Sequence, residues 1–251
     1  MHQTVSFERD ALVSMASNSL APGPFAAAVV YCTRTCFQGE AMKMKQYLKG
    51  IWDQQHRCPS GIMGWLAGEQ MVRQHRPETA WTLDLLDIQL ADQVLEVGFG
   101  AGQGIKLAAS KAREGRVMGV DLSDVMVQAA TRRNARAVRA RRVVLVRGSI
   151  TALPFEDQQF DKIMTIHTFY FWPEPSQVLS ELRRVLKPGG RLVITLCTGT
   201  MNAQGEVKMW PLQSILETQV MPDMQRGSFQ VVRMAQGPNS RQYTSVALIG
   251  E

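Results

Sequence analysis

The chain has 251 residues, of which 45% are hydrophobic, so it is long enough to bury a full core. No apolar run reaches the roughly 18 residues that a membrane span needs, and Glu8 and Asp10 argue against a transit peptide. The four cysteines are too few for a disulfide framework and lack zinc-ligand spacing. We therefore expect a cytoplasmic globular protein with free thiols and no metal site.

The net charge of +6 comes from one segment, because residues 131–142 contain six arginines and no acidic residue. A helix from Ser123 to about Arg139 would place apolar residues on one face and Arg132, Arg136 and Arg139 on the other. This pattern is typical of a solvated helix face, and no aromatic residues alternate with the arginines to stack on bases. Nucleic acid is therefore not the expected partner.

The N-terminal part of the chain divides into two predicted segments. Residues 1–41 mix Ser, Ala, Pro and Gly without a sustained period, so we expect a poorly ordered extension. Residues 42–90 predict a helical cap or lid, in which two amphipathic pieces are interrupted near Cys58-Pro-Ser-Gly61 and another helix follows Pro77. The remaining residues, 91–251, predict one further domain.

From residue 91 onward, short apolar runs alternate with helical segments. Such alternation indicates a doubly wound, Rossmann-like α/β fold with a mostly parallel sheet and helices on both faces. Two β-rich runs, 229–234 and 243–249, flank the turn residues 237–240 and predict a C-terminal antiparallel hairpin, which makes seven strands in all. The strands predicted before the hairpin are 93–97, 116–120, 143–146, 162–166 and 191–196, and the predicted helices are 103–112, 123–139, 175–186 and 210–220.

A glycine-rich segment, EVGFGAGQG at residues 96–104, begins within the first of these strands. Glycines after the first strand of a βαβ unit let a nucleotide approach the backbone closely. The dinucleotide pattern G-x-G-x-x-G or A fails in every register, because its last position falls on Gln103, Ile105 or Leu107. The segment therefore does not favour a dinucleotide.

Two acidic residues indicate a different ligand. Glu96 lies two residues before the first glycine, where its carboxylate would repel pyrophosphate but attract an ammonium group. Asp121 follows the second predicted strand, where a carboxylate can accept hydrogen bonds from ribose hydroxyls. The implied ligand is an adenosine that carries a cationic amino acid, and S-adenosylmethionine fits that description.

A series of motifs resembles the class I S-adenosylmethionine-dependent methyltransferases, in particular the small-molecule group that includes ubiquinone and menaquinone biosynthesis methyltransferases. The resemblance covers about residues 91–196, and its motifs are specific for the fold and the cofactor but not for the substrate. The motifs are VLEVGFGAG (94–102), GVDLS (119–123), ALPF (152–155), FD (160–161) and RVLKPGG (184–190).

The resemblance implies how S-adenosylmethionine, or its product S-adenosylhomocysteine, is bound. The glycine loop would curve around the methionine part, Asp121 would hold the ribose, and Leu122 would lie beside the adenine. Ser149 stands where the family usually has an aspartate that bonds the adenine amino group, and serine would accept this bond more weakly. The implied cofactor-binding residues are Glu96, Gly98, Phe99, Gly100, Gly102, Asp121, Leu122, Ser149, Ile150, Thr165 and Ile166.

Methyl transfer requires positioning and, for an acceptor that must lose a proton, a base. His167 follows the fourth predicted strand, where it could act as this catalytic base or only bond the backbone. Aromatic residues follow His167, and others lie in the predicted N-terminal helices, so we expect an apolar or aromatic acceptor pocket. The residues expected to bind the substrate are Tyr47, Trp65, Tyr170 and Trp172.

The sequence thus predicts an enzyme that transfers a methyl group from S-adenosylmethionine to a small, apolar or aromatic acceptor. Two alternatives remain open. One is a protein of the same fold that binds the cofactor without methylation, and the other is an RNA methyltransferase that uses the basic segment from Arg132 to Arg142. The [DNS]-P-P-[FYW] tetrapeptide of enzymes that methylate amino groups on bases or glutamine is absent after the fourth strand, where residues 166–169 read IHTF. A homodimer is compatible with the sequence.

Overall fold

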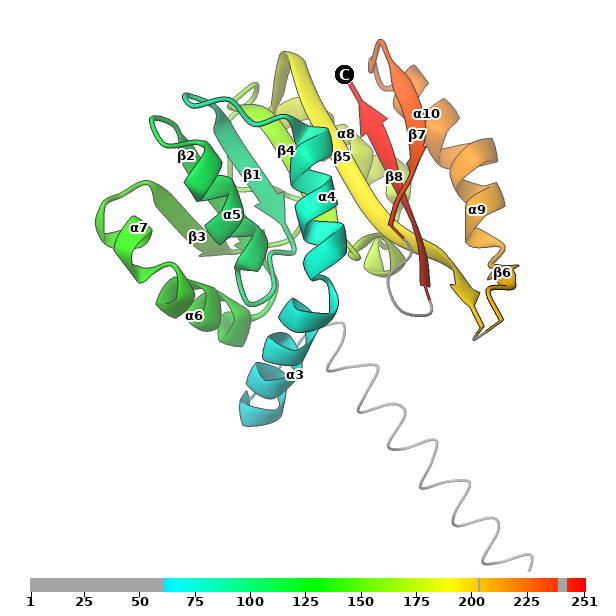
Figure 1. Ribbon diagram of the computed structural model, residues 1–251. Helices are drawn as coiled ribbons and strands as arrows, with labels where there is room; N and C mark the ends of the chain where they lie inside the picture. Colours follow the sequence, from blue (N-terminus) through cyan, green and yellow to red (C-terminus); the bar gives the residue numbers. More distant parts are fainter. Residues whose placement is uncertain (1–60, 203, 239–242) are drawn as a thin grey trace, which may run out of the picture. The chain divides into compact units, whose positions relative to one another are not determined.

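The computed structural model describes residues 61–202, 204–238 and 243–251 (Figure 1). These residues form one sheet with the strand order β3-β2-β1-β4-β5-β8-β7, and β6 pairs with β5. The first five strands in this order are parallel, whereas β8 is antiparallel to both of its neighbours. The strands are β1 Gln93–Val97, β2 Arg116–Asp121, β3 Val143–Arg147, β4 Phe160–Ile166, β5 Leu186–Met201, β6 Val207–Met209, β7 Val232–Gln236 and β8 Tyr243–Gly250.

Helices connect the strands and lie on both faces of the sheet (Figure 1). The predicted fold class, a doubly wound and mostly parallel α/β sheet that ends in an antiparallel hairpin, is confirmed. Among the described residues, no helix combines the length and apolar character needed to cross a bilayer. The helices are α3 Gly61–Gln74, α4 Arg76–Leu86, α5 Gln103–Lys111, α6 Asp124–Arg133, α7 Ala135–Arg139, α8 Pro175–Val185, α9 Leu212–Ile215 and α10 Met221–Arg226, with a 3-10 turn at Phe169–Phe171 and a π-helical turn at Leu216–Val220.

The central strands are buried on both faces because their apolar side chains alternate between two core clusters. In β1, Val94 belongs to the cluster that includes residues of α4 and α5, whereas Leu95 belongs to the cluster that includes residues of α8. In β5, Val193 faces the first cluster, and Leu192 and Ile194 face the second. Burial on both faces is what a parallel sheet covered by helices requires.

Helix α4 covers part of the sheet. Leu83 and Leu86 are 1% and 0% exposed in the first core cluster, and the Thr82 hydroxyl lies 2.6 Å from that of Thr195 on β5. This part of the predicted cap therefore packs directly on the sheet. Residues 1–60 lie outside the described part of the chain, so the boundaries predicted at residues 41 and 90 stay predictions.

Helix α3 packs on α6 beside the loop that follows β1. A Cβ on Gly68 would lie 2.9 Å from the Met126 side chain, so this glycine lets the two helices approach closely. An ion pair between Glu69 and Arg133 links the same two helices. Helix α3 is thus held next to the glycine loop.

Some elements differ from their predicted bounds. The helix predicted over 123–139 is broken at Asn134, whose side-chain amide donates to the carbonyl of Gly102 in the glycine loop. The helix predicted over 210–220 continues as a chain of short helices to Arg226, and β5 already begins at Leu186. The short strand β6 was not predicted, because its side chains are all exposed and show no alternation.

Candidate functional site

The glycine loop between β1 and α5 adopts a backbone that glycine accommodates most easily. Gly98, Gly100 and Gly102 have φ values of 71°, 50° and 80°, all in the left-handed region. A Cβ on Gly98 would lie 2.3 Å from Thr168 Cγ2, whereas a Cβ on Gly100 would meet no atom within 4 Å. The left-handed backbone therefore explains why glycine occurs at every second position of this loop. Open space lies beside Gly100.

Glu96 holds its carboxylate beneath this loop. The residue is 4% exposed, and Gly104 makes room for it, since a Cβ there would lie 2.3 Å from Glu96 Oε1. The backbone N–H of Ile105 donates a hydrogen bond to this carboxylate, yet Oε2 has no partner among the described residues. Burial and, less strongly, the charge of Asp121 raise the pKa of Glu96 to about 8. A buried carboxylate oxygen is thus available to a cationic donor.

Asp121 ties the glycine loop to the turn that follows β2. Its Oδ2 accepts a hydrogen bond from the N–H of Gly100 at 2.9 Å, and its Oδ1 accepts one from the N–H of Ser123 at 2.9 Å. Burial raises the pKa of Asp121, and these backbone donors oppose the rise. Each oxygen keeps further acceptor capacity, so the same carboxylate can also bind the hydroxyl groups of a ligand.

A cavity of about 200 Å³ lies over the carboxyl ends of β1, β2 and β4. The strand order reverses between β1 and β4, and doubly wound sheets bind ligands at such a switch point. The glycine loop, Glu96 and Asp121 belong to its wall. Much of the remaining wall comes from α3, the start of α4 and the turn after β4, with further residues from α6 and the loop after β3. The first three segments contribute Met71, Val72, His75, Thr79, His167, Thr168, Phe171 and Trp172.

His167 follows β4 with a left-handed backbone, φ 57°, which is unusual for a residue with a side chain. Its ring centroid lies 4.2 Å from that of His75, the residue that precedes α4. The Nε2 atom of His167 is buried and has no partner among the described residues. Burial and, less strongly, His75 lower the pKa of His167 to about 3. The turn thus brings a neutral imidazole with an available nitrogen to the cavity wall.

Most of the residues predicted to bind the cofactor line the cavity. They are Glu96, Gly98, Phe99, Gly100, Asp121, Leu122, Ile150 and Ile166, and the predicted catalytic residue His167 lies with them. Gly102 instead packs against α6, where a Cβ would lie 2.5 Å from a side-chain atom. The Ser149 hydroxyl bonds that of Thr151 at 2.7 Å, and the Thr165 hydroxyl bonds that of Thr168. Gly102, Ser149 and Thr165 are not in the cavity wall, although each stands next to a residue that is.

Of the residues predicted to bind the substrate, Trp172 lines the cavity, and its indole N–H donates to the Thr168 hydroxyl at 3.1 Å. Tyr170 is not in the wall; its hydroxyl donates to the carbonyl of Cys197 at 3.0 Å and accepts from the N–H of the same residue at 2.6 Å. Tyr47 and the side chain of Trp65 lie outside the described part of the chain. The substrate-binding roles stay predictions.

The sequence did not reveal which residues of α3 and α4 reach the cavity. On α3, Gly68, Met71 and Val72 follow helical spacing, and His75 and Thr79 extend the same side into α4. This periodicity indicates that the residues share one helix face. The sequence near them does not predict which strands that face packs over. The other wall residues not predicted are Val97, Ala101, Gln103, Gly104, Val120, Met126, Gly148, Thr168 and Phe171.

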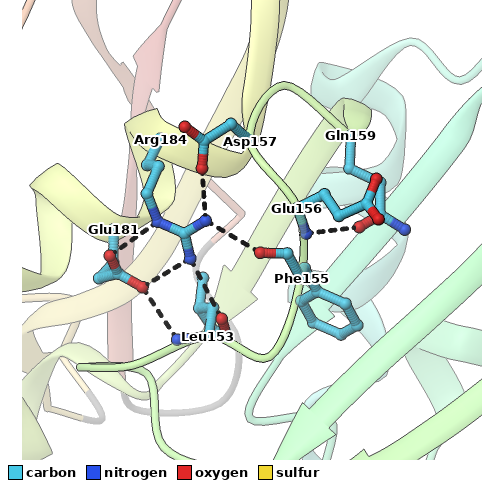
Figure 2. A network of polar contacts seen from close by, with 7 residues as sticks. All are labelled: Leu153, Phe155, Glu156, Asp157, Gln159, Glu181 and Arg184. Atoms are coloured by element: carbon cyan, nitrogen blue, oxygen red, sulfur yellow. Dashed lines mark hydrogen bonds and ion pairs between the residues drawn. The ribbon is translucent and has the colours of Figure 1, made fainter.

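An arginine fixes the segment between β3 and β4. Arg184 on α8 pairs with Glu181 at 2.9 Å and with Asp157 at 2.8 Å, and it donates to the carbonyls of Leu153 and Phe155 (Figure 2). Glu181 also accepts a hydrogen bond from the N–H of Leu153 at 2.9 Å. The bonds to Arg184 hold the pKa of Glu181 below its ordinary range. The network anchors the loop that connects the cavity wall to β4.

Known proteins are similar to about half of this chain. Residues 95–194 match a family described as a methyltransferase domain. The chain is 30% identical over 131 residues to the uncharacterized methyltransferase YdaC of Bacillus subtilis. The aligned residues make up 52% of this chain and 70% of YdaC. It is also 32% identical over 122 residues to a demethylmenaquinone methyltransferase of Bacillus cereus. This alignment includes 48% of this chain and 51% of that protein. The match thus spans only about half the length of that enzyme.

Solved structures share the fold at low sequence identity. A SAM dependent methyltransferase from Aquifex aeolicus superimposes with a TM-score of 0.58 at 20% identity and covers 74% of this chain and 97% of its own. An N-methyltransferase of Haemonchus contortus, solved with phosphomonomethylethanolamine and S-adenosylhomocysteine, gives a TM-score of 0.58 at 17% identity and covers 74% of this chain and 56% of its own. The chain therefore belongs to the methyltransferase family, with the class I S-adenosylmethionine-dependent fold that its motifs predicted.

Proposed function

We propose that this protein is an enzyme that transfers the methyl group of S-adenosylmethionine to a small, apolar or aromatic acceptor. The main observation in support is that a carboxylate oxygen and an imidazole nitrogen, both without a hydrogen-bond partner among the described residues, belong to the wall of one cavity. Among the described residues, Glu96 Oε2 and His167 Nε2 are buried without a hydrogen-bond partner, and both residues line the cavity. The carboxylate suits the cationic end of the cofactor, and the imidazole suits the acceptor.

The cofactor lies across the carboxyl ends of β1 and β2. Its ammonium group binds Glu96, which ionises because a nearby cation favours the charged carboxylate. Asp121 accepts hydrogen bonds from the ribose hydroxyls, and Leu122, whose side chain is 50% exposed, covers the adenine. Gly100 allows close approach to the loop, because a Cβ there would face open space.

The acceptor lies between the turn after β4 and the helices α3 and α4. Met71, Val72, Phe171 and Trp172 make this part of the wall apolar, which favours an apolar or aromatic molecule. His167 accepts a hydrogen bond from the reacting group. Because burial lowers the pKa of His167 to about 3, the imidazole is a weak base, and a weak base requires an acceptor that is itself acidic, such as a phenol.

The basic segment does not contribute to this site. Arg132, Arg136 and Arg139 are exposed on α6 and α7, and none of them lines the cavity. A solvated helix face accounts for them, which favours a small molecule over RNA as the acceptor. A filter-binding assay with RNA at increasing salt separates the two, since an RNA enzyme should bind with a steep salt dependence.

A second candidate function is cofactor binding without methylation. The [4+2]-cyclase SpnF shares the fold with a TM-score of 0.56 at 17% identity, covering 69% of this chain and 80% of its own, so this fold also occurs in a protein named for another reaction. Incubation with S-adenosylmethionine and a panel of phenols, quinols and aliphatic alcohols distinguishes the two functions. A methyltransferase forms S-adenosylhomocysteine only when an acceptor is present, whereas cofactor binding without turnover for every acceptor would favour the second candidate.

A further inference from the structure

Three side chains that commonly ligate metals meet at the acceptor end of the cavity. His75, Glu78 and His167 each offer one ligand atom, and these atoms all lie within 4.8 Å of one another. His75 and Glu78 are three residues apart at the start of α4, a spacing that places both on one side of a helix. His167 reaches them from the turn after β4, where its backbone is left-handed.

We propose that this cluster binds one divalent transition-metal ion, with Zn²⁺ as the preferred ion, and that the ion contacts the methyl acceptor. Only the second half of this statement rests on the proposed function. Two imidazoles and one carboxylate form a common ligand set for zinc, and three protein ligands leave a fourth position open for substrate. His75 and His167 line the cavity and Glu78 is 1% exposed, so a fourth ligand would reach the ion from the cavity.

The cluster needs a small contraction to hold an ion. Ligand atoms about 2.1 Å from one tetrahedral ion lie roughly 3.4 Å apart, so the widest pair here would close by up to about 1.4 Å. Rotation of the side chains can supply a movement of this size. His167 Nε2 is buried and makes no hydrogen bond among the described residues, and the Glu78 carboxylate would supply negative charge beside the ion.

With the ion bound, the imidazole of His167 would be a metal ligand rather than the hydrogen-bond acceptor for the reacting group, and the ion would acidify the acceptor in place of a protein base. An acceptor hydroxyl bound at the open position loses its proton to solvent, because a metal ion stabilises the oxyanion. Its oxygen then attacks the methyl carbon, and the electrons of the carbon–sulfur bond return to sulfur, which leaves as a neutral thioether. His75, Glu78 and His167 act in this step as ligands that position the ion.

The test uses the full chain after removal of metal with a chelator. Calorimetric titration with Zn²⁺ should show one ion bound per chain, and Co²⁺ should give the visible absorption of a tetrahedral site. His75→Asn, Glu78→Gln and His167→Asn should each weaken Zn²⁺ binding by about tenfold or more. The matched control Glu114→Gln, which changes an exposed glutamate, should bind Zn²⁺ as the wild type does.

Thermal melting without metal identifies which variants are folded, and only folded variants are compared. If Glu78→Gln does not fold, His75→Asn is compared with the wild type instead. His75 is partly exposed, so this substitution should disturb the fold less. Absence of saturable Zn²⁺ binding by the wild type, or unchanged affinity in the folded variants, would overturn the metal site. Titration with S-adenosylhomocysteine in the absence of metal is a separate readout. If the chain binds S-adenosylhomocysteine but not Zn²⁺, only the metal site is refuted. If it binds Zn²⁺ but not S-adenosylhomocysteine, only the proposed function is refuted.

Discussion

The Glu96→Gln substitution keeps the size of the side chain but removes an ionisable group from a site that is 4% exposed. Burial raises the pKa of Glu96 from its ordinary value of 4.5 to about 8. Because the folded-state value lies above the unfolded one, the protonated form stabilises the fold. This contribution is fully present below pH 4.5 and is lost as the pH rises through about 8.

The size of the loss follows from the two pKa values. At about 1.4 kcal/mol for each pH unit between them, ionisation of Glu96 costs roughly 5 kcal/mol above pH 8 and roughly 3 kcal/mol at pH 7. Glutamine does not ionise, so the variant has no such loss. The difference in free energy of unfolding, variant minus wild type, should therefore rise by several kcal/mol between about pH 5 and about pH 8.5.

Urea denaturation over this pH range measures the free energy of unfolding of the empty protein. The exposed control Glu114→Gln should follow the wild-type curve, because it makes the same chemical change on a solvent-exposed side chain. Parallel curves for wild type and Glu96→Gln would refute the reasoning. They would mean that Glu96 is already ionised in the folded protein at low pH.

The same residue should couple cofactor binding to proton release. At pH 7 Glu96 is mostly protonated in the empty protein, and the ammonium group of S-adenosylhomocysteine favours the ionised form. Calorimetry in buffers of different ionisation enthalpy should show release of nearly one proton by the wild type and none from this site in Glu96→Gln. The variant should bind about 10- to 100-fold more weakly, because hydrogen bonds to a charged group are worth roughly 1.5–3 kcal/mol.

Further substitutions test the loop and its support. Asp121→Ala removes the acceptor for the N–H of Gly100, so S-adenosylhomocysteine should no longer raise the melting temperature as it does for wild type. Gly104→Ala places a Cβ 2.3 Å from the Glu96 carboxylate and should destabilise the protein by about 1–3 kcal/mol in urea denaturation, whereas Lys106→Ala on the exposed side of the same helix should not. Arg184→Met leaves Glu181 and two backbone carbonyls without their partner and should cost about 2–3 kcal/mol by the same measurement; a wild-type midpoint would contradict the role of this network.

The fold could be predicted because its signals are local. Strands such as β1 and β4 are short apolar runs bounded by turns, and the positive φ angles of Gly98, Gly100 and Gly102 explain why glycine recurs there. Elements set by tertiary contacts were harder to predict. The helix breaks at Asn134, which bonds the glycine loop, and the strand β6 is exposed and, among the described residues, pairs with the extended β5 alone.

In the candidate site, too, some residues could be predicted from local sequence, whereas others depend on tertiary packing. Glu96 and Asp121 could be predicted, because each lies at a fixed offset from a glycine turn or strand end. The acceptor side could not, since it depends on how α3 and α4 pack over strands that come much later in the chain. His75 and His167 are far apart in sequence, yet their rings lie 4.2 Å apart, and no spacing rule would have paired them.

The central claim is that the cavity over β1, β2 and β4 binds the methyl-donor cofactor. Calorimetric titration of the full chain with S-adenosylhomocysteine, and in parallel with NAD, tests it most directly. The account predicts saturable binding of one S-adenosylhomocysteine per chain and no comparable signal from NAD. Saturable binding of NAD, with no binding of S-adenosylhomocysteine at millimolar concentration, would contradict it.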